Sequence, residues 1–245
     1  MREWIAGRNP VYEALRAGRR HFFQLWMAEG APAKSRLAEI LELGRERRLS
    51  VQTVPKQRLQ SIEEHHQGVA LEASGYPYSS MMEMLALAEQ RGEPPLILIL
   101  DALQDPQNLG TLLRTAEIVG VHGVLLPLRH TASVTPSVVG SSSGASEHLL
   151  IAQVNLAQAI RQLKEAGVWV IGLEGSRQAE RFDRVRLDGA VALVVGSEGA
   201  GMRTLTRDSC DALIQIPMRG KIGSLNAAVA GSVALYLVWS ARGFG

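Results

Sequence analysis

The stretch from Ala190 to Val238 decides the fold of this chain of 245 residues. It reads AVALVVGSEGAGM, continues through a short helical segment, and then reads ALIQIPMRGKIGSLNAAVAGSVALYLV. Its two apolar runs, Val191–Val195 and Ala212–Ile216, are each followed by a loop that glycine or proline marks. Runs of this kind are typical of strands buried on both faces of a parallel sheet. Ligands bind where such strands end, so the two loops are the first candidates for a site.

The two loops differ in character. The first, residues 196–201, reads GSEGAG, and its three glycines allow positive φ and a close approach of the backbone to a ligand. The second, residues 216–226, leads into an expected helix, Asn226–Val238, that is apolar nearly all round. A helix without a polar face has to be covered on every side. We expect the cover to come from the domain's own core and from a second subunit.

Upstream of this stretch, apolar runs alternate with helical patterns from Leu96 onward, which predicts a parallel sheet flanked by helices. The expected strands are residues 96–100, 123–126, 148–154, 168–173, 191–195 and 212–216. The expected helices are residues 109–119, 155–166 and 226–238, with a helical turn at 135–139 and a charged, irregular excursion at 177–187.

The N-terminal third predicts a small α/β domain of its own. Expected strands lie at residues 22–27, 49–54 and 69–73, and expected helices at 11–17, 35–48 and near 56–61. The stretch Ser74–Pro95 is rich in glycine, proline and serine, so we interpret it as a linker with one helix at residues 81–90. Met81, Met82 and Met84 are expected to pack on a neighbouring surface.

Composition narrows the class of protein. Cys210 is the single cysteine, which excludes an internal disulfide and a cysteine-rich zinc site, and the six histidines show no ligand spacing, so we expect no metal. The opening residues do not form a signal peptide and the longest apolar stretch, Leu225–Trp239, is too short to span a membrane, so we expect a cytoplasmic protein. Residues 1–75 hold 12 Lys and Arg against 9 Asp and Glu, whereas the remainder holds 14 against 15. A basic N-terminal third suggests contact with a polyanion, although chance scatter of surface charge explains the count equally well.

The glycine-rich loop fits an adenosine-type ligand better than a dinucleotide or a free phosphate. GSEGAG is not the G-x-G-x-x-G fingerprint, and no acidic residue ends a strand about 20 residues later to hold a ribose. Gly220-Lys221 is followed by isoleucine, so a phosphate-binding P-loop is also unsupported. Apolar loops with several glycines offer mainly backbone N–H and C=O groups to a ligand.

These motifs carry a family resemblance. GSEGAGM followed by IPM…GSLNAAVAG resembles the second and third signature motifs of the SpoU (TrmH-like) family, which methylates the ribose 2′-hydroxyl of RNA. Asn108-Leu109-Gly110 followed by Arg114 matches the first motif. With its N-terminal part, the whole chain resembles the subgroup that methylates a guanosine of bacterial 23S ribosomal RNA.

The resemblance implies an architecture. Residues 1–74 resemble an RNA-binding domain with the fold of ribosomal protein L30e, residues 75–95 a linker, and residues 96–245 a SPOUT methyltransferase domain. That domain is implied to be an α/β knot, a Rossmann-like parallel sheet with a deep trefoil knot, and to form a homodimer. Neither the knot nor the dimer follows from periodicity or composition.

The resemblance also implies site residues. S-adenosylmethionine is expected against the two late loops, at Gly196, Gly201, Ile216, Met218 and Leu225. RNA is expected at Arg8 and Asn9, in an opening motif of the N-terminal domain, and at His66, in its closing motif. Gly144, Ala145 and Glu147 match a further family stretch. Taken singly, Ile216 or Leu225 fits a core residue as well.

The expected catalytic residues are Arg114, Asn108, Glu198, Ser224 and Asn226. Methyl transfer to a ribose hydroxyl needs the hydroxyl held at near-attack distance and its developing charge stabilised. Arg114 stays protonated in water, so it is suited to clamp an RNA phosphate or the alkoxide rather than to act as a base; a solvated surface arginine is the alternative.

The other four residues also leave alternatives open. Asn108 can orient Arg114 or the acceptor, or can cap its helix. Glu198 can fix the glycine loop or pair with Arg114. Ser224 and Asn226 can each cap the last helix or face the acceptor ribose or the methionine moiety.

Four functions compete on the sequence. The leading one is methylation of 23S ribosomal RNA with S-adenosylmethionine, and the second is the same chemistry on tRNA or another rRNA site. The third is a non-catalytic RNA-binding factor in ribosome assembly, against which the intact candidate residues speak. A nicotinamide dehydrogenase is contradicted by the missing fingerprint.

Overall fold

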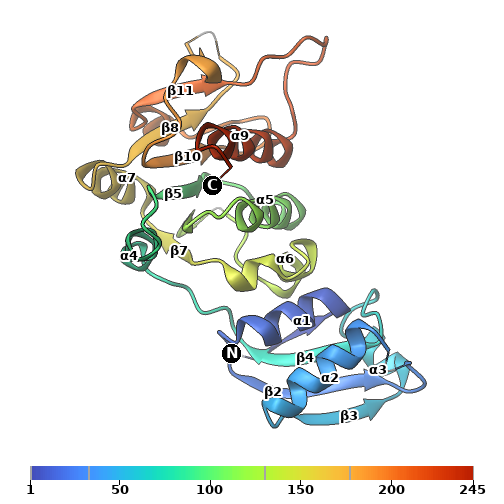
Figure 1. Ribbon diagram of the computed structural model, residues 1–245. Coiled ribbons are helices and arrows are strands. Elements are labelled where there is room, and N and C mark those ends of the chain that lie inside the picture. The colour runs from blue at the N-terminus through green and yellow to red at the C-terminus, as the bar shows by residue number, and fades with distance from the viewer. Residues whose placement is uncertain (1, 33, 130, 177, 245) are drawn as a thin grey trace. The chain divides into compact units, whose positions relative to one another are not determined.

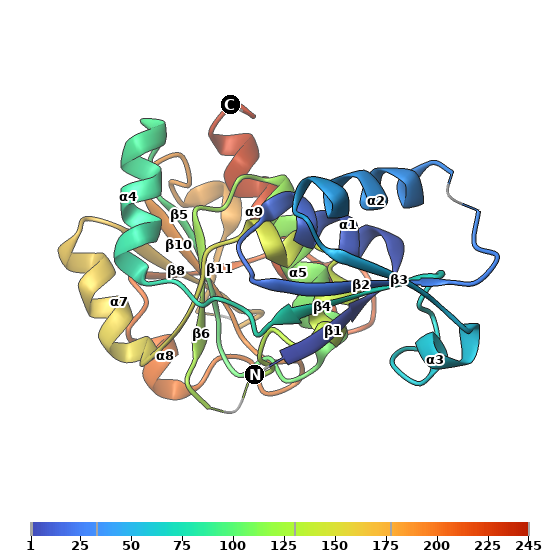
Figure 2. The same cartoon turned by 90° about the horizontal axis from the view of Figure 1, so that it is seen from below.

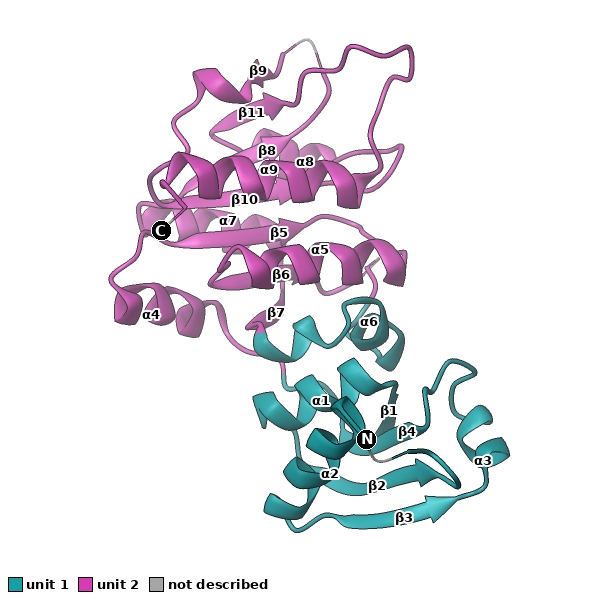
Figure 3. Cartoon of the chain, turned by 45° about the vertical axis from the view of Figure 1, so that its right-hand side comes forward, with its two compact units in different colours: residues 1–77, 133–148 teal, residues 78–132, 149–245 magenta. Residues whose placement is uncertain are grey.

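A computed structural model describes residues 2–32, 34–129, 131–176 and 178–244 of the chain. Met1, Arg177 and Gly245, which bound segments predicted above, lie outside the described residues. The chain divides into two compact units (Figure 3). Unit 1 comprises Met1–Pro77 and Ser133–His148, and unit 2 comprises Tyr78–Ala132 and Leu149–Gly245. Unit 1 is therefore discontinuous in sequence, because a segment from the middle of the chain belongs to it.

Unit 1 is built on a four-stranded mixed sheet in the order β1-β4-β2-β3 (Figure 1). The strands are β1 (Arg2–Ala6), β2 (Phe22–Ala28), β3 (Ser50–Val54) and β4 (Val69–Ser74). β1 and β2 each pair antiparallel with β4, and β3 pairs parallel with β2. The sequence predicted β2, β3 and β4. It missed β1, whose five residues include two charged side chains and a single fully buried one, Ile5.

Helices cover both faces of the unit 1 sheet. α1 (Arg8–Ala17) and α2 (Arg36–Glu46) lie on one face and α3 (Lys56–Gln60) on the other (Figure 2). Gly18 ends α1 in the left-handed conformation, as expected for a glycine just past a helix. Trp26 belongs to the apolar cluster on the α3 side.

The middle segment of unit 1 is held by a buried ion pair. It contains α6 (Pro136–Ser141) and the 3-10 turn η1 (Ala145–His148). Arg20 donates from Nε and Nη2 to the two carboxylate oxygens of Glu147, at 2.7 Å each, and both side chains are almost fully buried. Arg20 also pairs with Glu3. The expected strand at 148–154 is wrong in its first residues, because η1 extends to His148 and β7 begins at Ile151.

Unit 2 is built on a seven-stranded sheet in the order β7-β6-β5-β10-β8-β11-β9. Every strand pair in it is parallel. The strands are β5 (Leu96–Leu100), β6 (Gly123–Pro127), β7 (Ile151–Val154), β8 (Trp169–Leu173), β9 (Glu180–Arg181), β10 (Val191–Val195) and β11 (Ala212–Gln215). The predicted parallel sheet is confirmed. The excursion expected to be irregular contains the short edge strand β9 and a 3-10 turn, Phe182–Arg184.

Helices lie on both faces of this sheet (Figure 2). α4 (Met81–Arg91) and α7 (Leu156–Glu165) share an apolar cluster with one set of strand residues, and α5 (Pro106–Ile118) and α9 (Ala227–Ala241) lie on the other face. Gly231 allows α9 its close approach, since a Cβ there would lie 2.6 Å from Leu112 Cδ2. Met81 and Met84 are buried as predicted, whereas Met82 is 70% exposed, which corrects the prediction for that residue.

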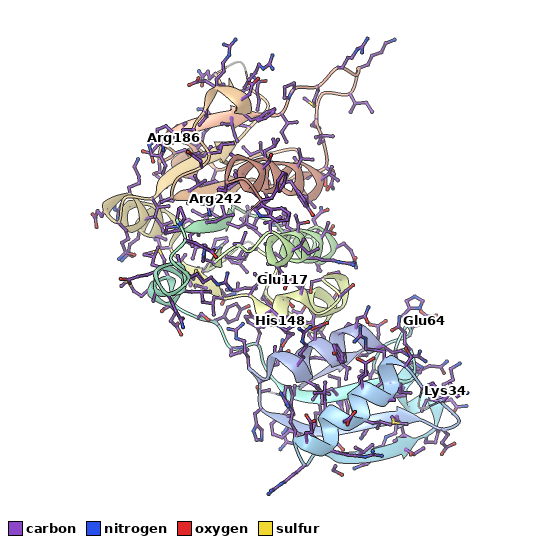
Figure 4. All side chains as sticks on the ribbon, in the orientation of Figure 1. Lys34, Glu64, Glu117, His148, Arg186 and Arg242 are labelled. Atoms are coloured by element: carbon purple, nitrogen blue, oxygen red, sulfur yellow. The ribbon has the colours of Figure 1, made fainter. Side chains whose placement is uncertain are left out.

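The end of α9 is tied to the opposite edge of the sheet from the late loops. Arg242, labelled in Figure 4, donates to the carbonyl oxygens of Pro94, Pro95 and Gly189 at 2.6–2.9 Å. These three carbonyls precede β5 and β10, so one side chain holds the helix C-terminus against the start of both strands. None of the helices in the described residues is long and apolar enough to cross a membrane. The trefoil knot concerns chain threading, which strand order does not settle, so it stays a prediction.

Candidate functional site

The glycine loop that follows β10 is a closed turn. Ser197 and Gly201 exchange backbone hydrogen bonds of 3.0 Å in both directions, and Gly199 and Gly201 have positive φ. Gly196 is sterically obligatory, because an added Cβ would lie 2.2–2.5 Å from backbone atoms of Gly201 and Met202. The sequence predicted close backbone approach here, and the structure adds that the loop's own backbone makes the approach.

A buried carboxylate anchors the far end of this loop. Asp101, directly after β5, is fully buried and accepts from the backbone N–H of Arg203 at 2.8 Å and from Arg203 Nε at 2.7 Å. The Asp101 N–H donates to the Val195 carbonyl at 2.8 Å, which joins the ends of β5 and β10. Sequence inspection missed this anchor; a charged residue at the end of an apolar run was the only available signal.

A cavity of about 480 Å³ opens beside the loop, at the carboxyl ends of β8 and β10, within the size range of small-molecule sites. All five predicted cofactor residues line it, together with Glu198 and Ser224 of the predicted catalytic set. Those lining residues are Gly196, Gly201, Ile216, Met218, Leu225, Glu198 and Ser224. We call this space the strand-end cavity. Its lining combines the glycine loop with the apolar side chains of Ile216, Met218 and Leu225.

Asn108, Glu198 and Asn226 form a hydrogen-bonded cluster next to this cavity. Asn226 Nδ2 donates to Asn108 Oδ1 at 3.0 Å and to Glu198 Oε2 at 3.2 Å, and Asn108 Nδ2 donates to Glu198 Oε2 at 3.4 Å. Asn226 Oδ1 accepts from the N–H groups of Ala228 and Val229, which fixes its amide orientation. Residues 90 and 118 positions apart are thus joined at one place.

The structure shows which of two asparagines caps its helix. Asn226 is the N-cap of α9, and it also belongs to the cluster. Asn108 is not an N-cap, because α5 begins at Pro106 and its cap is Asp105, which accepts from the N–H groups of Gln107 and Asn108. The start of α5 was predicted three residues too late. A Pro after Asp is the signal that was available.

Arg114 stands apart from the strand-end cavity. It lies on α5, six residues after Asn108, is exposed, and is not among the residues that line the cavity. The structure therefore brings together all nine predicted cofactor and catalytic residues other than Arg114. Seven of them line the cavity, and Asn108 and Asn226 are bonded to Glu198 at its edge.

Charged residues that the sequence did not single out also line the strand-end cavity. Arg207 Nε donates to Glu174 Oε2 at 2.8 Å. Burial alone would raise the pKa of Glu174, but hydrogen bonds from Arg207 and Ser176 and the charge of Arg207 outweigh it, so the pKa is lowered. Glu174 is therefore a carboxylate at neutral pH. Cys210 lies nearby in sequence, and burial raises the pKa of its thiol to about 12, so it stays a neutral thiol.

Unit 1 contains a second cavity, of about 870 Å³, at the end of β2 and the start of α3. Arg8 and His66 of the predicted RNA-binding set line it, with Lys56, Glu64 and Gln67. Asn9 is exposed but does not line it. We call this space the unit 1 cavity. Its lining includes charged or polar side chains from seven residues: Arg8, Glu29, Lys56, Glu64, His65, His66 and Gln67.

His66 is held as a neutral donor in the unit 1 cavity. Its Nδ1 accepts from the Gly68 N–H at 2.9 Å, so the ring proton of the neutral form sits on Nε2. Burial first, and the charge of Lys56 second, lower the pKa of His66. Arg8 is fixed by donating from Nε to the Gln67 carbonyl oxygen at 3.2 Å. In the part of the chain that the structure describes, no group of three His, Cys, Asp or Glu side chains is placed to hold a metal ion.

Two family models match the chain in the order of the two predicted regions. The model for RNA 2′-O ribose methyltransferase substrate binding matches residues 4–79, and that of the SpoU rRNA Methylase family matches residues 95–236. The chain belongs to the SpoU family. The SpoU resemblance inferred from the motifs is confirmed, as is an α/β fold with a substrate-binding part before a methylase part.

Relatives and solved structures agree. YacO of Bacillus subtilis, named as a TrmH family tRNA/rRNA methyltransferase, is 40% identical over 244 residues, which cover 98% of this chain and 96% of YacO. The SpoU methyltransferase AviRb of Streptomyces viridochromogenes, solved in complex with AdoMet, has a TM-score of 0.82 at 24% identity, covering 99% of this chain and 91% of AviRb. An AdoMet-bound rRNA methyltransferase of Sinorhizobium meliloti has a TM-score of 0.79 at 24% identity, covering 98% of this chain and 87% of that one. At these identities the two structures show that this SpoU chain shares their fold.

Proposed function

We propose that this SpoU protein methylates the ribose 2′-hydroxyl of a guanosine in bacterial 23S ribosomal RNA, with S-adenosylmethionine as the methyl donor, in the cytoplasm. The observation that carries the proposal is the Asn108–Glu198–Asn226 cluster at the edge of the strand-end cavity. It unites residues from all three motifs beside a space of cofactor size. The AdoMet found in AviRb and in the Sinorhizobium meliloti enzyme supports the choice of donor.

The residues present fit this cofactor. S-adenosylmethionine, when bound, supplies an electrophilic methyl group on a sulfonium. Gly196 and Gly201 offer backbone groups without side chains, which suits hydrogen bonds to a purine edge and ribose. Ile216 and Leu225 offer apolar contact to the ring, and the Glu174 carboxylate can attract a positive charge.

The acceptor hydroxyl needs a fixed polar environment, and the asparagine cluster supplies one. Asn226 is locked by the two backbone bonds that cap α9, so its amide needs no reorganisation during the reaction. Glu198 and Ser224, from the two loops, can orient the hydroxyl from the cavity side. Arg114 is proposed to bind the phosphate beside the target ribose or to stabilise the developing alkoxide, which an exposed guanidinium on α5 allows.

Unit 1 is proposed to bind RNA through its own cavity. Arg8 and Lys56 bring positive charge for phosphate, and the His66 Nε2–H is a donor for a base or ribose. Asn9 is proposed to contact RNA outside the cavity, since it is exposed at the start of α1. The basic excess of residues 1–75 agrees with a polyanion as the partner.

A homodimer through the methylase part is also proposed. α9 buries one side in unit 2 and leaves Val229, Val233 and Tyr236 exposed at 48%, 37% and 44%. Spacings of four and three residues place these side chains on one stripe. Unit 2 thus covers one side of α9, and the other side, which we expected to be covered as well, stays exposed within the chain. A second copy would cover the stripe, which a gel-filtration and light-scattering measurement tests.

The test of the function is methyl transfer with mapping of the product. The protein is incubated with radiolabelled S-adenosylmethionine and, separately, an unmethylated 23S rRNA transcript and a tRNA transcript pool. Label at one guanosine ribose of the 23S transcript is expected. Label in tRNA alone would overturn the 23S assignment, but it would still support methyl transfer to RNA from S-adenosylmethionine. Binding of RNA without any transfer and without S-adenosylmethionine affinity would favour a non-catalytic assembly factor.

A further inference from the structure

A third cavity, of about 450 Å³, lies in unit 2 at the carboxyl ends of β6 and β7. Like the strand-end cavity, it lies at the carboxyl ends of the sheet strands, and two consecutive residues line the two cavities. Met202 lines the strand-end cavity and Arg203, the next residue, lines this one. Consecutive Cα atoms are about 3.8 Å apart, so the two cavities are neighbours where the glycine loop ends. We call it the Arg129 cavity.

The lining of the Arg129 cavity combines positive charge with exposed apolar side chains. Arg129 and Arg203 are its charged residues, and none of its lining residues in the described chain is acidic. Leu128 and Leu205 are 64% and 67% exposed, which is high for leucines that flank a cavity. Leu156 and Ala157, the first two residues of α7, also line it, so the positive end of that helix adds to the field.

Arg203 is a preorganised cation. Its backbone N–H and its Nε are both bound by the buried Asp101 carboxylate, and Nη2 lies 2.6 Å from Asp101 Oδ1. Its side chain nevertheless remains 47% exposed. One edge of the guanidinium is therefore fixed by the fold while the other can face a ligand, which lowers the entropy lost on binding an anion.

We infer that the Arg129 cavity binds a nucleotide of single-stranded RNA. Its phosphate lies on the guanidinium groups of Arg129 and Arg203, and its base or sugar lies against Leu128 and Leu205. A phosphate alone leaves the two exposed leucines without a role, and an apolar ligand leaves the cations without one. A nucleotide satisfies both, and only an unpaired one exposes a base face to apolar side chains. The inference rests on the proposed function, since this nucleotide belongs to the strand that carries the methylated ribose.

The experiment measures binding of a fluorescein-labelled, single-stranded RNA of twelve nucleotides to the full chain by anisotropy at several salt concentrations. Arg129→Ala is expected to weaken binding about tenfold and to reduce the salt slope by about one, because one phosphate contact is lost. Leu205→Ser is expected to weaken binding about threefold with an unchanged slope, because it removes apolar contact only. Arg203 is left intact, because its loss would leave the buried Asp101 without its partner.

Arg161→Ala is the matched control, since Arg161 is an exposed cation on α7 outside the cavity and should bind as the wild type does. Wild-type affinity and slope in Arg129→Ala overturn the inference, as does a wild-type chain that binds no RNA. Transfer of label from S-adenosylmethionine to 23S rRNA is measured in parallel. Absent transfer with the expected anisotropy pattern refutes the proposed function alone, so the two failures are distinguishable.

Discussion

The strand-end cavity of unit 2 and the unit 1 cavity differ in the residues that shape them. The first is lined by glycine backbone, by apolar side chains and by the charged Glu174, Glu198 and Arg207, and its shape depends on a loop closed by its own hydrogen bonds. The second is lined by Arg8, Lys56, Glu64 and His66, whose charges and donors face the space (Glu64 is labelled in Figure 4). We call the strand-end cavity backbone-built, because an atom added to its glycine loop should disturb ligand binding. We call the unit 1 cavity charge-built, because removal of one of its charges should weaken ligand binding.

The interiors of the two units also differ, because unit 1 contains a buried ion pair. The sheet of unit 2 is covered by an apolar cluster that joins α4, α7 and alternate strand residues. Unit 1 also has an apolar interior, but its middle segment is held by Arg20 and Glu147, both almost fully buried. Burial by itself lowers the pKa of Arg20, and hydrogen bonds and charge from Glu147 and Glu3 outweigh it, so the pKa is raised.

Removal of the buried cation should have the largest effect. Arg20→Ala leaves Glu147 buried without its partner, which is expected to cost about 3–5 kcal/mol of unfolding free energy. Urea unfolding measures it. Arg16→Ala is the control, because Arg16 is 63% exposed and pairs with Glu13 on the surface. Equal stability of the two variants would contradict the distinction drawn between the units.

Removal of the exposed arginine on α5 should act on chemistry alone. Arg114→Ala is expected to reduce kcat by about 10²–10³, the usual effect of removing one charge-stabilising group. S-adenosylmethionine affinity, measured by calorimetry, should be unchanged, because Arg114 does not line the strand-end cavity. A loss of folding instead would mean that Arg114 is structural.

Addition of one methyl group should disable the backbone-built cavity. Gly196→Ala places a Cβ within 2.2–2.5 Å of the Gly201 and Met202 backbone, so the glycine loop has to move. A displacement of about 1 Å is expected to lower activity about 10²-fold and to weaken S-adenosylmethionine binding. Gly220→Ala is the control, since no atom lies within 4 Å of the added Cβ. Similar losses in both variants would sink the steric explanation.

Removal of one charge should weaken the charge-built cavity. Lys56→Ala is expected to raise the Kd for RNA about tenfold and to reduce the salt slope by about one, with S-adenosylmethionine binding unchanged. Arg45→Ala removes an exposed cation of α2 that does not line the cavity, and should leave the Kd near the wild-type value. RNA affinity measured across a salt series checks both.

The smallest effect is expected at the single cysteine. Because burial raises the pKa of Cys210 to about 12, its thiol should react far more slowly with Ellman's reagent at pH 8 in the folded protein than an unfolded cysteine does. In urea the same thiol should react at the rate of an unfolded cysteine. The raised pKa also makes stability depend on pH. Cys210 contributes to the free energy of unfolding fully below pH 9, the ordinary pKa of a thiol, and this contribution is lost as the pH rises toward 12. Rapid labelling of the native protein would refute the burial.

Local sequence patterns predicted most of the elements, because strand and helix periodicity is written in consecutive residues. β5 and β10 begin and end where the apolar runs do, and Asn155 caps α7 as its position indicated. The failures are equally local in cause. The charged residues of β1 hide its alternation, and the Asp105-Pro106 pair, which marks the start of α5, excludes the capping alternative for Asn108.

The candidate site could be predicted where its residues lie in one motif and not where they meet across the chain. Motif order placed Gly196, Ile216 and Leu225 at one cavity. No pattern signals that Glu174 and Arg207 line the same cavity, or that Asp101 holds Arg203 from 102 positions away. Such residues come together because the order of strands in the sheet places distant segments side by side.

By itself, the sequence determined which segments form buried strands, where glycine must allow the backbone to turn, and which family chemistry the three motifs serve. Those properties depend on side-chain size and polarity within a few residues. Only the tertiary structure decided that residues 133–148 belong with unit 1, through an ion pair between residues 127 positions apart, and that Asn108, Glu198 and Asn226 share their hydrogen bonds. Hydrogen bonds and ion pairs act over a few ångströms in space without regard to separation along the chain, so only folding brings their partners together.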